Sequence, residues 1–198
     1  MTYFNVFSLY NCTTSKCREV SEKELINACR NGDKDAQKEL YIQYAEKVYA
    51  LCIRYLGDKE IALDYTHDAI IKALLSLSRF KYSGDGSFYV WLRKIAINMI
   101  IDNYRQSKRI KQVSISTIPE PADDNEDNLL PTVPPEILLR MISSMTEERR
   151  IVFNMYCIDG YSHKEIARRL GITEKGSASI LAKARALLKK KVFDYVDE

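Results

Sequence analysis

Apolar side chains recur at helical spacing through the first half of the chain. Ser21 and Glu24 have the spacing of an N-terminal capping box, so a short helix should begin there and end at Asn31-Gly32. Longer helices should follow, separated by Gly57-Asp58 and by the two-glycine loop 82–87. No run alternates with period two for long enough to predict a sheet. The helical stripes comprise Leu40, Tyr44, Val48, Leu51 and Tyr55; Ala62, Tyr65, Ala69, Ala73 and Leu77; and Phe88, Trp91, Leu92, Ile95, Ala96, Met99 and Asn103.

The pattern breaks in the middle of the chain. Residues 113–136 contain six Asp and Glu, no Lys or Arg, and all five prolines of the chain. Proline blocks helix formation and like charges repel one another, so this composition predicts an extended, flexible linker, which we place at 112–135.

Helical spacing returns after the linker. An amphipathic helix is expected near residues 137–145, and Thr146 can cap a second one. The sequence thus predicts an all-α chain with two small helical domains, at 21–111 and 136–198, preceded by an N-terminal tail of residues 1–20.

The last two predicted helices have the form of a helix-turn-helix. Ser162 and Glu165 open the first of them with a second capping box, and residues 170–173 join it to a helix that runs toward Lys191. Gly171 supplies the positive φ that such a sharp turn needs. Two short helices joined in this way are typical of a DNA-reading module.

This C-terminal stretch is strongly basic, although the whole chain has a net charge of only +3. Residues 162–191 contain nine Lys and Arg against two Glu, a net charge of +7. Clustered cations favour nucleic-acid binding, and small residues among them would let the backbone approach a groove closely. A solvated basic face on an ordinary helical hairpin is the alternative. The exposed face should carry Lys175, Ser179, Ala182, Ala186, Lys189 and Lys190, with Lys183 and Arg185 nearby.

A second basic cluster follows the only tryptophan, and aromatic residues lie just before the cluster. Unpaired bases stack on aromatic rings while nearby cations neutralise their phosphates, so this combination favours single-stranded nucleic acid. Core packing is the favoured role for Phe88 and Trp91, which share the apolar stripe, whereas Tyr82 and Tyr89 are freer to face a ligand. The cations are Arg93, Lys94, Arg105, Lys108, Arg109 and Lys111.

The sequence gives little support for an enzyme, a metal-binding protein or a membrane protein. Five cysteines without metal-ligand spacing and only two histidines predict no disulfide framework, metal site or catalytic triad, so we expect no enzyme, cofactor or small-molecule substrate. Asp64 and Asp68 lie one helical turn apart, and a solvated docking face explains them more simply than a catalytic carboxylate pair. The apolar start of the chain is too short to span a bilayer and lacks a cleavage pattern, so we expect a cytoplasmic protein without membrane insertion.

Three segments resemble the extracytoplasmic-function (ECF) sigma factors of the sigma-70 family. Residues 80–98 are similar to the family's region 2, which typically reads Phe-x-x-Trp-Leu-x-x-Ile-Ala-x-Asn. Residues 64–73 resemble its polymerase-docking helix, with His67 and Ile70 in place of the usual Gln and Phe. Residues 160–173 resemble its region 4. These blocks occur in the family's order, which is more specific than any block alone.

The resemblance implies a transcription initiation factor whose partners are core RNA polymerase and promoter DNA, and which an anti-sigma factor holds inactive. The first domain would bind the polymerase and the −10 element, and the second would bind the −35 element, while the acidic linker follows a basic channel of the polymerase. The implied polymerase-binding residues are Asp64, His67, Asp68 and Lys72. The implied −10 residues are Tyr89, Trp91, Arg93, Lys94, Asn98, Asn103 and Arg105. The implied −35 residues are Ser162, Lys175, Ser177, Ser179, Lys183 and Arg185.

A dimeric helix-turn-helix regulator with an N-terminal sensing domain is the alternative function. It explains the basic C-terminal helices equally well, but not the basic helix that carries Trp91 or the acidic linker. Such a regulator would protect duplex DNA by itself, whereas a sigma factor should need core polymerase.

Overall fold

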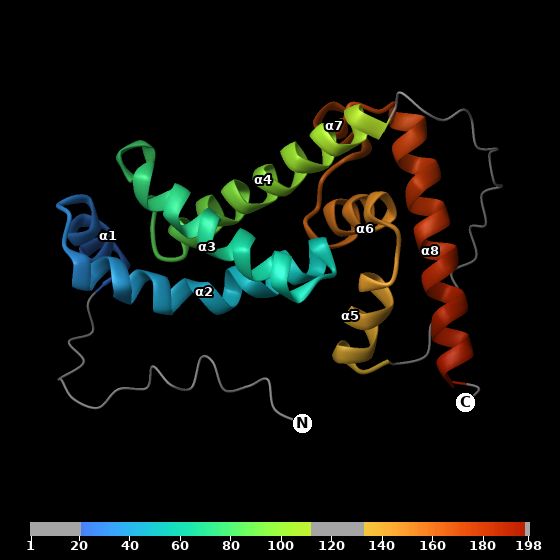
Figure 1. Cartoon of the computed structure of the whole chain (residues 1–198), viewed down its shortest axis with the longest axis horizontal. Helices are drawn as coiled ribbons and strands as arrows, with labels where there is room; N and C mark the ends of the chain where they lie inside the picture. The colour runs from blue at the N-terminus through green and yellow to red at the C-terminus, as the bar shows by residue number, and fades with distance from the viewer. Residues whose placement is uncertain (1–20, 112–132, 197–198) are drawn as a thin grey trace.

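The computed structural model describes residues 21–111 and 133–196, which form helices joined by short turns (Figure 1). No strand occurs within these two ranges, which confirms the all-α prediction. The predicted N-terminal tail and nearly all of the predicted linker lie outside the described residues. Helices α1–α4 form a first set and α5–α8 form a second set beside it.

The first two helices begin at the predicted caps. α1 (Glu22–Arg30) starts at Ser21, whose hydroxyl accepts a hydrogen bond from the Glu24 backbone N–H at 3.3 Å. The Glu24 carboxylate accepts one in return from the Ser21 N–H at 3.1 Å, which completes the capping box. α2 (Lys34–Leu56) starts at Asp33, whose carboxylate accepts hydrogen bonds from two N–H groups of the first turn.

The third helix is shorter than its apolar stripe predicted. α3 (Lys59–Leu75) follows Gly57, which ends α2 in the left-handed region at φ 72°. The sequence placed Leu77 on this helix, but Leu77 is the first residue of a separate 3-10 turn, η2 (Leu77–Arg79). The Ser76 hydroxyl donates back to the Lys72 carbonyl oxygen in the last turn of α3 at 2.6 Å.

The fourth helix, α4 (Ser87–Lys111), has 25 residues and packs against both α2 and α3. Its first turn is anchored by a side chain from α1. The Glu22 carboxylate accepts hydrogen bonds from the N–H groups of Gly86 at 2.6 Å and Phe88 at 2.9 Å. A carboxylate at this position also interacts favourably with the positive end of the helix dipole.

The second set contains four helices and one π-helical turn. The helix predicted to follow Thr146 consists of two parts, because the hydrogen-bond pattern widens after Phe153. The last helix continues past the predicted Lys191 to Val196. The elements are α5 (Pro135–Ser143), α6 (Glu147–Phe153), the π turn η3 (Asn154–Ile158), α7 (His163–Leu170) and α8 (Glu174–Val196).

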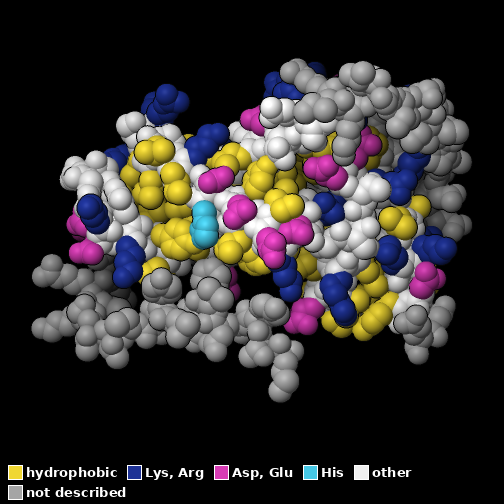
Figure 2. Space-filling view, in the orientation of Figure 1, with side chains coloured by type: hydrophobic (Ala, Val, Ile, Leu, Met, Phe, Trp, Pro, Cys, Tyr) yellow, Lys and Arg dark blue, Asp and Glu magenta, His cyan; other side chains and the backbone are white. Residues whose placement is uncertain are grey.

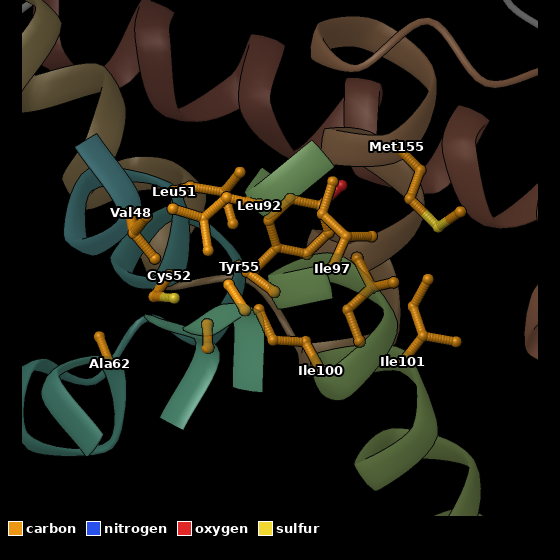
Figure 3. Packing of buried hydrophobic residues seen from close by; sticks show 14 of the residues in the cluster. Val48, Leu51, Cys52, Tyr55, Ala62, Leu92, Ile97, Ile100, Ile101 and Met155 are labelled. Carbon is orange, nitrogen blue, oxygen red and sulfur yellow. The ribbon is translucent and has the colours of Figure 1, made fainter. Parts of the chain in front are cut away.

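The two sets of helices pack against each other. α2 contacts α5 and α6, and α4 contacts α7. One continuous hydrophobic cluster includes buried residues of both sets, and Figure 3 shows part of it around Tyr55, Leu92 and Ile97 together with Met155 of the second set. Two separate apolar patterns in the sequence therefore contribute to one shared core.

A buried arginine joins α6 to the end of α2. Arg150 is only 8% exposed. Its Nε donates to the carbonyl oxygen of Tyr55 at 2.7 Å, and its Nη2 donates to that of Leu56 at 2.6 Å. Its Nη1 donates to the carbonyl oxygens of Ser143 at 2.8 Å and Met145 at 3.0 Å. Carbonyls at helix C-termini lack partners within the helix, so one guanidinium caps the ends of both α2 and α5.

Candidate functional surfaces

The first candidate surface is the exposed side of α3. Ala62, Ala69 and Ala73 are buried on the opposite side, which fixes the orientation of the helix. Figure 2 shows a histidine among apolar and acidic side chains over this part of the molecule. All of the residues predicted to bind polymerase are exposed here: Asp64, His67, Asp68 and Lys72.

Apolar side chains surround these polar groups. Ile61 is 48% exposed, Ile71 is 53% exposed and Leu75 is 82% exposed. By contrast, Ile70, which stands where the family usually has Phe, is buried in the core. Exposed apolar groups among carboxylates favour a protein partner, because carboxylates repel the phosphates of nucleic acid.

The second candidate surface begins with the aromatic residues of α4. Phe88 is fully buried, with its ring centroid 5.0 Å from that of Tyr44 and 5.8 Å from that of Trp91. Trp91 is only partly buried. Tyr89 stacks on Tyr44 at 6.4 Å, and the Lys47 ammonium lies 5.9 Å from the Tyr89 ring. The core role predicted for Phe88 is therefore confirmed, and Trp91, although only partly buried, packs against the same core, as does Tyr89.

The polar residues predicted for the −10 element all lie farther along α4, but the second set of helices contacts two of them. Arg93 Nη2 lies 2.8 Å from Asp159 Oδ1. Asn98 Oδ1 accepts a hydrogen bond of 2.6 Å from Arg169 Nη1. The other predicted residues on α4 are exposed or partly exposed: Lys94, Asn103 and Arg105.

Asp159 is a structurally important residue that sequence reasoning did not single out. Its side chain is only 2% exposed, and its Oδ1 lies 3.1 Å from Arg54 Nη2 as well as close to Arg93. The Tyr55 hydroxyl donates to its other carboxylate oxygen. Burial and the charge of Asp159 raise the pKa of Tyr55, so this hydroxyl stays protonated. The partners are 66 to 105 residues away in the chain, so no local pattern could reveal them.

The third candidate surface is the helix-turn-helix formed by α7 and α8. Ser162 and Glu165 form the predicted capping box at the start of α7. Gly171 ends α7 with φ 71°, as the turn requires, and Thr173 Oγ1 accepts a hydrogen bond from the Gly176 N–H at 2.9 Å. A Cβ on Gly176 would lie 3.0 Å from that oxygen, so a larger residue here would crowd the Thr173 cap in the first turn of α8.

The two sides of α8 differ sharply in character. The buried side consists of Leu181, Ala184, Leu188 and Val192, together with Ser177. The remaining predicted DNA-binding residues of this helix are exposed or partly exposed: Lys175, Ser179, Lys183 and Arg185. These cations, with the small residues between them, form the basic side that the sequence predicted.

Ser177 requires a correction, because the structure does not bring it to the basic side. Its side chain is fully buried, and its Oγ lies 3.0 Å from Nδ1 of His163 at the start of α7. The His163 ring also stacks on that of Tyr156 at 4.4 Å. Burial, and then the nearby Arg185, lower the pKa of His163, so a neutral ring links the two helices. Ser162 is exposed, but its hydroxyl is hydrogen-bonded within the capping box.

Among residues 21–111 and 133–196, no group of His, Cys, Asp or Glu is arranged to hold a metal ion. Within the same ranges, no helix combines the length and apolar character needed to cross a membrane.

The fold and its surfaces together define an all-helical DNA-binding adaptor with an additional face suited to a protein. Comparison with known families makes this specific. Residues 40–110 match the model of sigma-70 region 2, and residues 136–188 match that of sigma-70 region 4. The chain belongs to the sigma-70 family and is a sigma factor of the ECF type. The alternative of a dimeric regulator with a sensing domain is therefore wrong, because region 2 occupies the place of that domain.

Sequence and structure comparisons find similar proteins. The chain is 27% identical over 186 residues to the ECF RNA polymerase sigma-E factor of Escherichia coli strain K12, covering 88% of this chain and 95% of the relative. It is 29% identical over 157 residues to the ECF sigma factor BldN of Streptomyces coelicolor, covering 76% of this chain and 58% of the relative. Among solved structures, the sigma factor RpoE in complex with the anti-sigma factor NepR from Bartonella quintana aligns with a TM-score of 0.47 and 16% identity, over 78% of this chain and 95% of that chain.

Proposed function

We propose that this sigma factor divides its work among three surfaces. The exposed side of α3 binds core RNA polymerase, α4 holds an unpaired −10 strand, and α8 reads the −35 duplex. The domains that carry these tasks are those at 21–111 and 136–198. The chain acts by binding and not by catalysis, in the cytoplasm, where it finds polymerase and DNA, and an anti-sigma factor is a further partner.

The observation that carries this proposal is the two-sided character of α8. The helix buries Leu181, Ala184 and Leu188 against its neighbours, so its orientation is fixed. Lys175 is exposed, and Ser179 and Lys183 are partly exposed, in the first half of a helix-turn-helix recognition helix. The N-terminal part of such a helix is the part that enters a major groove. Small side chains between the lysines leave the backbone room to approach base edges.

The role of α4 rests on the combination of ring faces and cations. Tyr89 and Trp91 are only partly buried, and Lys94 is exposed on the next turn. Stacking on a ring contributes about 1–3 kcal/mol per base, and it is available only when the base is unpaired. Promoter opening would then be driven by preferential binding to the separated strand.

The decisive experiment is run-off transcription with purified core polymerase on genomic promoter fragments. We expect defined start sites only when the chain is added to core polymerase. Asp64→Ala should lower the affinity for core polymerase, because it removes an exposed carboxylate from the α3 face. Asp194→Ala is the matched control, since Asp194 is an exposed acid at the far end of α8. Equal pull-down of core polymerase by the wild type and both variants would refute the assignment of α3.

A further inference from the structure

Helix α1 binds both ends of the loop 81–86, which connects η2 to α4. The last residue of α1, Arg30, holds the start of the loop. Its Nη2 donates to the carbonyl oxygen of Phe80 at 2.5 Å, and its Nε donates to that of Leu77 at 3.3 Å. The first residue of α1, Glu22, holds the end of the loop, because its carboxylate accepts hydrogen bonds from two N–H groups at the start of α4. Hydrogen bonds to charged groups are stronger than neutral ones, so both ends are firmly placed.

The helix that carries these two charges is itself fixed by the core. Leu25, Ile26 and Cys29 of α1 are buried, and α1 packs against α2. Glu22 and Arg30, which we call the α1 clamp, are therefore presented to the loop as a pair from one oriented helix.

Both residues of the α1 clamp support the ring of Trp91. Phe80, whose carbonyl oxygen is bound by Arg30, has its ring centroid 5.1 Å from that of Trp91. Phe88, whose N–H is bound by Glu22, has its ring centroid 5.8 Å from that of Trp91. The two phenylalanine rings meet edge to face at 5.5 Å. A shift at either end of the loop would therefore move a ring against which Trp91 packs.

Glu22 also acts on Tyr89, through Tyr44. Burial raises the pKa of Tyr44, and the charge of Glu22 and a hydrogen bond to it raise this pKa further. The Tyr44 hydroxyl therefore stays protonated and donates to the Glu22 carboxylate. The Tyr44 ring stacks on that of Tyr89, with centroids 6.4 Å apart and planes 10° apart. Both rings that we assign to the unpaired strand, Tyr89 and Trp91, thus depend on the same carboxylate.

We propose that Glu22 and Arg30 are positioning residues for the unpaired strand. The α1 clamp sets the places of Tyr89 and Trp91, whereas its two charged groups bind only protein. The proposal rests on the function proposed above for α4. It makes an unusual prediction for Glu22, because a carboxylate near DNA repels phosphates and its removal would by charge alone tighten binding. Loss of the clamp predicts weaker binding instead.

The expected loss is that of one well-placed ring. Glu22→Ala and Arg30→Gln should each weaken binding of single-stranded DNA about fivefold, the lower end of what one stacked base contributes. Glu22→Gln keeps one oxygen acceptor for the N–H groups of α4, so its affinity should lie between those of Glu22→Ala and the wild type. The slope of log affinity against log salt should stay unchanged in Arg30→Gln, because the guanidinium binds carbonyl oxygens, whereas loss of a phosphate contact would reduce it by about 0.7.

Two measurements test this inference. Fluorescence anisotropy with a labelled single-stranded DNA oligonucleotide of mixed sequence gives the affinity of the holoenzyme at several salt concentrations, with core polymerase alone as the blank. Emission of the free full-length chain gives a local readout, because Trp91 is its only tryptophan. In Glu22→Ala and Arg30→Gln the emission maximum should move to longer wavelength as the Trp91 ring becomes more exposed to water.

Matched controls separate positioning from charge and from folding. Glu39→Ala on α2 and Lys23→Gln on α1 remove the same charges at exposed sites and should change neither DNA affinity nor emission. The far-UV circular dichroism of the clamp variants and their pull-down of core polymerase should equal those of the wild type, because the helices and the exposed side of α3 are not altered.

The outcomes separate this inference from the proposed function. If Glu22→Ala binds DNA as tightly as Glu39→Ala, or more tightly, the positioning role is refuted. A shift in emission with unchanged DNA affinity would also refute it, because the clamp would then serve only the fold. A lower salt slope in Arg30→Gln would make Arg30 a direct phosphate contact. If Glu22→Ala loses its circular dichroism signal, Glu22→Gln and Arg30→Gln decide. A wild-type holoenzyme that binds the oligonucleotide no better than core polymerase alone would instead refute the function proposed for α4.

Discussion

Replacing Arg150 with Met is the perturbation that best tests how the two helical sets are held together. Methionine has a similar length and keeps much of the packing of the aliphatic stem, but it removes all four hydrogen bonds of the guanidinium. Two of those bonds stay within the second set, one to Ser143 at the end of α5 and one to Met145 just after it, and two reach the end of α2 in the first set. The substitution therefore removes a cap and an inter-set contact at once.

The magnitude can be bounded from the geometry. A hydrogen bond to a charged group contributes about 1.5–3 kcal/mol, so four such bonds give an upper limit of roughly 6–12 kcal/mol. The bonds share one side chain and are not additive, and carbonyls at helix ends can partly recover bonds to water once the guanidinium is gone. We expect a loss of about 3–5 kcal/mol, which is a large part of the stability of a typical domain.

Urea denaturation followed by far-UV circular dichroism measures this loss. The midpoint for Arg150→Met should fall by more than about 1 M urea relative to the wild type. Arg140→Met, at an exposed position on α5, is the matched control and should change the midpoint little. If the two variants showed equal midpoints, Arg150 would not be the link between the sets that its four bonds indicate.

Three further predictions concern the turn after α2, the helix-turn-helix and its DNA contacts. In urea denaturation, Gly57→Ala should lower the free energy of unfolding by about 2–3 kcal/mol and Gly32→Ala by about 1 kcal/mol. Both glycines have a positive φ, but an added Cβ would clash only at Gly57, where it would lie 2.7 Å from Nη1 of Arg150. Equal losses would contradict the clash. Lowering the pH from about 7.5 to about 5.5 should reduce the Tm of the wild type more than that of His163→Gln. The pKa of His163 is lowered below its unfolded value of about 6.5, so the unfolded state binds more protons in this range and the free energy of unfolding decreases as the pH is lowered. Identical pH profiles of the two proteins would argue against a buried neutral ring. With holoenzyme on promoter duplex, Lys175→Ala should reduce the slope of log affinity against log salt by about 0.9, whereas Lys38→Ala on α2 should leave it unchanged. An unaltered slope in the first variant would count against a phosphate contact.

Local signals in the sequence were sufficient to predict most of the secondary structure. The two capping boxes at Ser21 and Ser162 and the glycines at 57 and 171 act through contacts within a few residues, and the structure contains all of them. Two features of the secondary structure were not predicted, and their causes are also local. The π turn η3 and the early end of α3 at Leu75 depend on hydrogen-bond geometry that hydrophobic spacing does not report.

The exposed sides of the helices followed from the same spacing. Asp64 and Lys72 on α3, and Lys175 and Lys183 on α8, lie away from the core because the apolar residues between them determine which side is buried. Ser177 was the exception, because a small polar residue is equally compatible with a surface and with a buried hydrogen bond. Only its partner, His163 on the preceding helix, decided which side it would face.

The sequence by itself determined the helices, most of their starts and the sigma-factor resemblance, because each of these depends on neighbours along the chain. Tertiary structure alone decided that the two sets close against each other through Arg150, Asp159 and Glu148. The partners of those side chains in the first set lie 40 to 105 residues away, and polar pairing across such separations leaves no periodic trace in the sequence.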